Sequence, residues 1–297
     1  MNAAAALPAP VLVGEHGGVR LAVERRTGRT RVTELECRPP LQVLRLHELD
    51  EDVPDLATAI LASPSGGVLD GDRMTLEVSV GPGARLHLGT QSATRVYRTP
   101  GSGARLDVSV SVAEGGYLEL MPDPYMPYRG SRFEAMSRCE LAPGGTLIVR
   151  EIVGPGRTAR GEILAFDRFE STLELRRPGG EIFGADTVRL DPSDGLDQVG
   201  LLGRHRCVGS LFVVHPGFQP EVLLEGAGLG ARSASQTADP ALASGAWSGA
   251  SSLPADAGAW LRVLASNTGA VSAVINRAWA ATRRLLIGAP PPPDHRF

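Results

Sequence analysis

The chain has 297 residues, a formal net charge of −3 and only 5% aromatic residues. This length suffices to bury a large core, and the charge gives no reason to expect nucleic acid or an anionic membrane as a partner. All 30 basic residues are arginine, which excludes lysine Schiff-base catalysis and the phosphate-binding lysine of a P-loop.

From residue 11 to residue 232 the chain reads as β-rich, because apolar and polar residues alternate with the period of a half-buried strand. Strands are predicted at residues 19–24, 75–80, 105–110 and 172–176. The continuous apolar run at residues 211–214 predicts a strand that is buried on both faces.

A short internal repeat joins three of these segments. Residues 80–88, 112–120 and 141–149 each end one strand, pass through a glycine-containing turn and begin the next strand. Strand units that recur about every 30 residues are typical of a layered, coil-like stack of short strands. An ordinary β-sandwich or barrel remains open as the alternative, because such folds reuse the same turn chemistry.

The pattern changes near the C-terminus. Residues 234–288 are expected to be loose or helical, and residues 289–297 form a proline-rich tail. Apolar residues from Val271 to Leu286 fall at helical spacing; Asn267 or Thr268 can cap the start, and Gly288 ends the helix. We therefore expect a single mainly β domain over residues 1–297, with one or two C-terminal helices.

The sequence gives little indication of disulfide bonds, a metal site, a signal peptide or a membrane span. Cys37, Cys139 and Cys207 are odd in number and far apart, so the sequence predicts neither a disulfide framework nor a structural zinc site. His205 and Cys207 share one face of a strand, but two ligands without a third are a weak metal signal. Without a signal-peptide pattern or a long apolar run, we expect a cytoplasmic protein that does not enter the membrane.

Four blocks of sequence, in order, carry a specific resemblance. They are Gly66-Gly67 with Gly71-Asp72, then Thr90 to Arg98, then Leu120 to Tyr128 followed by Gly130 to Phe133, and finally Arg150 to Arg157 with Gly161, Glu162 and Phe166. In these blocks the chain resembles the urease accessory protein family UreD, called UreH in some organisms. Arg95 stands where that family usually carries lysine.

The resemblance implies a urease maturation factor that is not an enzyme. Members of the family bind apo-urease together with UreF and with the GTPase UreG, and are thought to offer nickel an internal passage to the urease active site. No cofactor is expected to bind tightly, and Ni²⁺ would only be in transit. The missing P-loop agrees, because GTP hydrolysis must then belong to a partner.

Three acids are candidate ligands for nickel in transit: Asp72, Glu151 and Glu162. Carboxylate oxygens suit transit, because they hold Ni²⁺ less firmly than imidazole or thiolate ligands do. Each acid could instead have an ordinary structural role. Asp72 can close a glycine turn, and Glu151 and Glu162 can form surface ion pairs with the arginines around them.

Two further sets of residues are candidate lining or interface residues. If residues 90–98 form one strand, Thr90, Ser92 and Thr94 share a face and could line the passage or contact urease. Tyr97, on the other face, and Arg98 complete this candidate set. A proline-stiffened loop could dock a partner with little loss of entropy, or could instead plug the core. The interface set is Asp123, Pro124, Tyr125, Met126, Tyr128 and Arg157.

Two other functions compete with nickel passage. The first is a purely structural adaptor that never contacts nickel. The second is a hydrolase that uses paired carboxylates such as Glu151 and Glu162, which would need both acids around one sugar-lined cleft. The tryptophans all lie in the C-terminal region, at 247, 260 and 279, which disfavours the hydrolase.

Overall fold

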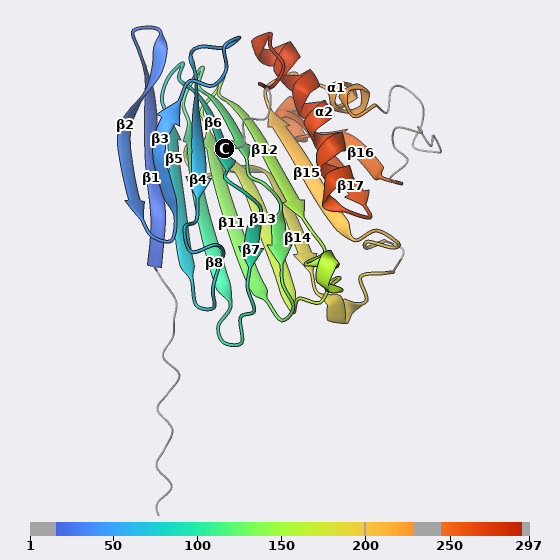
Figure 1. Cartoon of the computed structure of the whole chain (residues 1–297). Coiled ribbons are helices and arrows are strands. Elements are labelled where there is room, and N and C mark those ends of the chain that lie inside the picture. Colours follow the sequence, from blue (N-terminus) through green and yellow to red (C-terminus); the bar gives the residue numbers. More distant parts are fainter. Residues whose placement is uncertain (1–15, 199, 229–244, 293–297) are drawn as a thin grey trace, which may run out of the picture.

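Two β-sheets face each other, and two helices lie against the outer face of one of them (Figure 1). This computed structural model describes residues 16–198, 200–228 and 245–292. Sheet A consists, in spatial order, of β14 (Ile182–Leu190), β13 (Arg168–Arg176), β11 (Arg132–Leu141), β8 (Ala104–Val112), β5 (Arg73–Val80), β1 (His16–Arg26) and β2 (Arg29–Arg38).

Sheet B is the larger sheet. It consists, in spatial order, of β16 (Trp247–Ser252), β17 (Gly258–Ala265), β15 (Cys207–Val214), β12 (Thr146–Val153), β9 (Tyr117–Met121), β6 (Arg85–Thr90), β4 (Leu56–Ala62) and β3 (Gln42–His47). The short strands β10 (Tyr125–Pro127) and β7 (Thr94–Val96) pair with each other, and β10 also pairs with β12. Short 3₁₀ turns occupy Thr158–Arg160, Pro192–Asp194 and Pro254–Asp256.

The middle of the chain coils between the two sheets. From β4 to β13 the main strands alternate between sheet B and sheet A, and those that follow one another within a sheet pair in parallel. Antiparallel strands close the ends of both sheets. The predicted mainly β, coil-like stack is confirmed.

The internal repeat forms the turns that carry the chain from sheet A to sheet B. The backbone N–H of Gly83 donates to Glu114 O, and the N–H of Gly115 donates to Gly144 O, each at 3.3 Å, so successive turns stack. Gly83, Gly115 and Gly144 have φ values of 62°, 66° and 76°. These turns require glycine, because other residues rarely adopt that backbone conformation.

Side chains divide between two cores. Those that point between the sheets form the main apolar core. Those on the outer face of sheet B pack against α1 (Pro220–Gly226) and α2 (Thr268–Ile287). All eight residues of β15 are buried, which confirms the strand that was predicted to be buried on both faces.

The C-terminal region agrees with the prediction only in part. Helix α2 begins and ends as expected: Asn267 Oδ1 accepts a hydrogen bond from Ala270 N at 2.9 Å, and Gly288 has a φ of 77°. The expectation of a loose or helical segment over residues 234–288 is wrong for β16 and β17, whose small residues weaken the alternation. Residues 229–244 and 293–297 lie outside the described part of the chain. Across the residues that are described, no helix combines the length and the apolar character needed to span a membrane.

The single strand predicted over residues 90–98 is also wrong, because the chain changes partner there. The N–H of Gln91 donates to Leu61 O on β4 at 2.9 Å, and the N–H of Thr94 donates to Pro124 O at 3.0 Å. Strand β6 therefore ends at Thr90 and β7 starts at Thr94. The three hydroxyl residues do not share one strand face.

Candidate functional site: a polar cavity between the sheets

A row of polar residues crosses the inner face of sheet B. Strand register places Glu151 of β12 beside Ser210 of β15, and Ser210 beside Arg262 of β17. Their sequence neighbours on the same face, such as Phe212, belong to the core between the sheets. Because side chains alternate along a strand, all three polar side chains point inward, where the core is otherwise mainly aliphatic.

Sheet A presents polar residues opposite this row. Ser137 of β11, Leu173 of β13 and Asp186 of β14 are neighbours in register. Ser171 lies two residues before Leu173 and so shares its inward face. The hydroxyl of Ser171 donates a hydrogen bond to Glu151 across the gap between the sheets.

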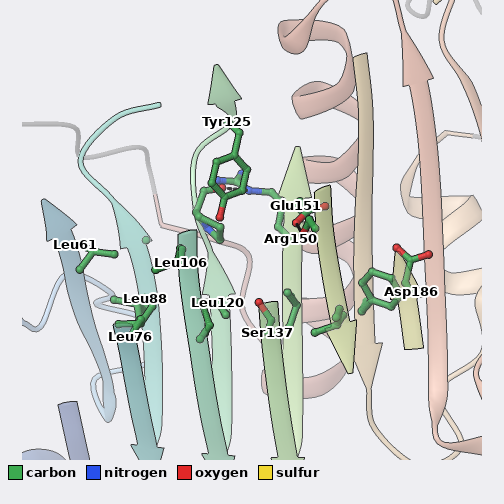
Figure 2. A pocket seen from close by; sticks show the side chains of 17 residues that line it. Leu61, Leu76, Leu88, Leu106, Leu120, Tyr125, Ser137, Arg150, Glu151 and Asp186 are labelled. Carbon is green, nitrogen blue, oxygen red and sulfur yellow. Dashed lines mark hydrogen bonds between the residues drawn. The ribbon is translucent and has the colours of Figure 1, made fainter. Parts of the chain in front are cut away.

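An inner cavity of about 70 Å³ runs between the sheets at this point. Figure 2 shows leucines from β4, β5 and β6 at one end and Glu151 and Asp186 toward the other. Its lining includes Leu61, Leu76, Leu88, Leu106, Leu120, Tyr125, Ser137, Glu151, Ser171, Leu173, Asp186 and Phe212. A cavity of this size has room for water molecules, and its polar end can hydrogen-bond them.

An outer cavity of about 160 Å³ adjoins the inner one. The two cavities share the lining residues Leu173, Asp186 and Phe212. The outer cavity also reaches Ser252 and Pro254, which are exposed. The outer cavity therefore extends from the shared lining residues to exposed residues at the edge of the sheets.

Glu151 has an unusual acidity for a glutamate. Burial raises its pKa to about 7, with a smaller contribution from the charge of Asp186, while the hydrogen bond from Ser171 and the charge of Arg262 oppose that rise. Its side chain nevertheless keeps some accessible surface, because it faces the cavity. The carboxyl group can therefore gain or lose a proton near neutral pH.

Asp186 has a direct cationic partner. Arg262 Nη2 donates to Asp186 Oδ1 at 2.5 Å, and the two side chains are 24% and 22% exposed. The guanidinium carbon of Arg262 also lies 5.3 Å from the centre of the Trp260 ring, which lines the outer cavity. Asp186, which lines both cavities, is thus bound by an arginine that lines neither of them.

The other two candidate nickel ligands lie elsewhere and line neither cavity. Asp72 is buried in the glycine turn, where its Oδ2 accepts a hydrogen bond from Leu69 N at 2.8 Å. Glu162 pairs with Arg157 at 2.5 Å and accepts a hydrogen bond from Arg129 N at 3.3 Å. Glu151 and Glu162 line no common cavity among those described, so the geometry gives the paired-carboxylate hydrolase no support.

The predicted lining residues also lie outside both cavities. Thr90 holds a turn, since its hydroxyl donates to Ser92 O at 3.1 Å and accepts from Asp123 N at 2.8 Å. Ser92 and Arg98 are exposed, and Thr94 is half-buried. A role for these residues in a passage stays a prediction.

Three of the candidate residues form a tyrosine–arginine ladder of Tyr97, Tyr128 and Arg157. The two tyrosine rings meet edge to face at 5.2 Å, and the Arg157 guanidinium lies 4.2 Å from the centre of the Tyr128 ring. The Tyr97 hydroxyl donates to Gly66 O at 3.4 Å. The ladder joins all four sequence blocks on a partly exposed surface.

The remaining members of the predicted interface loop are divided between surface and core. Tyr125 is buried, packs against Phe133 and Phe169 with ring centres 5.3 Å apart, and has a raised pKa because of burial and the nearby charge of Glu151. Asp123 is buried and pairs with Arg150 at 3.4 Å. Pro124 and Met126 are half-buried. For Tyr125 the core-plugging alternative describes the structure.

Sequence reasoning missed Asp186, Arg262 and Ser171. A local signal existed, since each occupies an inward position of a strand that otherwise turns apolar residues inward. Within the described residues, no group of three or more histidine, cysteine or acidic side chains could hold a metal ion. Any metal bound at Glu151 and Asp186 would therefore have two protein carboxylates and otherwise hydroxyl or water oxygens.

Comparison with known proteins finds relatives that match nearly the whole chain. The family model described as UreD urease accessory protein matches residues 15–296. A protein named urease accessory protein UreD 2 from Streptomyces griseus is 34% identical over 300 residues, covering 98% of each chain. Proteins named urease accessory protein UreD from Haloarcula marismortui and Photorhabdus laumondii are each 32% identical, over 96% and 93% of this chain and 91% and 84% of their own. The chain therefore belongs to the UreD urease accessory protein family.

Proposed function

We propose that this chain is a non-catalytic scaffold for urease maturation that assembles with UreF, UreG and apo-urease and lets nickel pass through its interior. Membership of the UreD family supports the role in maturation. The observation that carries nickel passage is Glu151, an acid that faces an internal cavity instead of solvent.

The chemistry of Glu151 suits a ligand that must release its cargo. A single carboxylate with hydroxyl neighbours binds Ni²⁺ through oxygen, which is a weaker set of ligands than imidazole or thiolate. Its pKa of about 7 means that protons compete with the metal at neutral pH. Asp186 provides a second oxygen ligand on the way to the outer cavity.

The test is Glu151→Gln in a cell that expresses urease with its full accessory set. We expect the accessory complex to assemble and the nickel content of purified urease to fall. Glu36→Gln is the matched control, because that acid is exposed on β2 and lines neither cavity. Unchanged nickel content in the Glu151 variant would leave the purely structural adaptor as the function.

The tyrosine–arginine ladder is the proposed partner-binding face. Tyrosine and arginine are enriched in the residues that dominate binding energy at interfaces, and the ladder is pre-organised by its own ring contacts. Tyr128→Ala should therefore reduce co-purification of the accessory partners or of apo-urease. Arg20→Ala, which removes an exposed arginine on β1, is the control and should leave co-purification unchanged.

A further inference from the structure

The ion pair between Arg262 and Asp186 adjoins both cavities through Asp186, since Arg262 itself lines neither of them. Asp186 lines both cavities, and its Oδ1 holds the Arg262 guanidinium at 2.5 Å. A divalent cation that leaves Glu151 for the outer cavity must come close to Asp186. While Arg262 is bound there, its positive charge repels such a cation and occupies the carboxylate that would attract it.

Neighbouring groups could stabilise the Arg262 guanidinium after it leaves Asp186. Its guanidinium already lies 5.3 Å from the centre of the Trp260 ring, within the range of a cation–π contact. Ser210 separates it from Glu151 in the strand register. Both members of the pair keep about a quarter of their side-chain surface accessible, so the pair is not locked by packing.

We propose that Arg262 is a charge-operated gate: by binding Asp186, which lines both cavities, it keeps this carboxylate from a passing cation until an incoming divalent cation displaces it. This inference rests on the proposed nickel passage and adds a specificity residue to it. A monovalent cation competes less well with the guanidinium than a dication does, because its attraction to the two carboxylates is half as large. The gate therefore favours divalent cargo.

The experiment uses the complete accessory complex with apo-urease and Ni²⁺ as the simple salt. Arg262→Gln removes the gating charge and keeps a polar side chain of similar reach. We expect the nickel concentration that half-saturates urease activation to fall on the order of tenfold, and equilibrium dialysis to show tighter Ni²⁺ binding by the accessory complex. Arg262→Lys keeps the charge and should behave like the wild-type protein.

Arg176→Gln is the matched control. Arg176 pairs with Glu174 at 2.6 Å, its side chain is 29% exposed, and it lies on the outward face of β13, away from both cavities. The substitution changes net charge by the same amount and should leave the nickel requirement unchanged. If Arg262→Gln behaves like this control, or if Arg262→Lys behaves like Arg262→Gln, the gate is overturned.

A folding defect in Arg262→Gln would not block the test. The double variant Arg262→Gln with Asp186→Asn leaves no unpaired charge, and the gate predicts that it needs less nickel than Asp186→Asn alone. An equal or higher nickel requirement overturns the gate. Failure of the gate is distinct from failure of the passage, because only the passage requires that Glu151→Gln lowers the nickel content of urease.

Discussion

Two glutamates lie deep in this protein on opposite faces of sheet B, and their surroundings differ. Glu119 lies under helix α2 and is fully buried, with His87 Nδ1 at 2.7 Å, the Tyr117 hydroxyl at 2.5 Å and Arg283 Nε at 3.4 Å. Glu151 lies between the sheets, with the Ser171 hydroxyl as its hydrogen-bond donor and a cavity in front of it. Burial alone therefore does not determine how well a buried acid is compensated by its neighbours.

The two pKa values move in opposite directions. Burial would raise the pKa of Glu119, but the hydrogen bond and charge of His87, the charge of Arg283 and the hydrogen bond of Tyr117 outweigh it and lower the pKa. Burial dominates at Glu151 and raises its pKa to about 7. The partners of Glu119 under α2 therefore outweigh the cost of its burial, and Arg283 links the helix to the sheet, whereas the cavity contains an acid that is not fully compensated.

The largest effect is expected from breaking the cluster under α2. Arg283 is fully buried and pairs with both Asp50 and Glu119, so Arg283→Met leaves two buried carboxylates without their cation. We expect the free energy of unfolding to fall by about 3–5 kcal/mol, measured by chemical denaturation. Arg284→Met, at an exposed position of the same helix, should stay within about 0.5 kcal/mol of the wild-type protein. Equal stability of the two variants would contradict the structural role.

Glu151→Gln should raise the free energy of unfolding, unlike Arg283→Met, and the size of this gain should depend on pH. Above pH 4.5 the unfolded chain loses the Glu151 proton, while the folded chain keeps it until about pH 7. The charged carboxyl therefore destabilises the folded state increasingly across that window. Denaturation at pH 5 and pH 8 should show the variant gaining about 3 kcal/mol relative to wild type at the higher pH. No gain with pH would mean that Glu151 is compensated like Glu119.

Glu119→Gln tests the compensated acid of this comparison. Because the folded pKa of Glu119 is lowered, its carboxylate stabilises the fold above the ordinary value of 4.5, and that contribution is lost as the pH falls through the folded pKa. The variant should lose about 2 kcal/mol of unfolding free energy at neutral pH and less in acid. A loss that does not shrink in acid would point to packing and not to charge.

Ser171→Ala should have the smallest effect. It removes the hydrogen bond that opposes the raised pKa of Glu151, so the carboxyl should titrate above its present value of about 7. The loss of stability should be about 1 kcal/mol. A carboxyl-carbon NMR titration would follow the pKa, and an unshifted Glu151 resonance would show that the hydroxyl is not its partner in solution.

Local sequence was sufficient for the elements whose causes are local. The glycines of the repeat predicted the stacked turns, because the required backbone angles favour glycine. The apolar spacing and Asn267 predicted α2 with its cap. The break at residues 91–93 could not be predicted, since it depends on Leu61 and Pro124, which bind the backbone on its two sides. The strands β16 and β17 depend on β15 in the same way.

By itself the sequence determined the family, the period-two strands, the turn chemistry of the coil and the C-terminal helix, because each depends on neighbouring residues or on ordered motifs. Only the tertiary structure decided which of the three candidate acids faces a cavity. Asp186 and Arg262 are 76 residues apart in sequence and meet because their two sheets pack face to face. A strand's alternation shows which side chains share a face, but the partner sheet decides which face is inward and what each buried acid meets there.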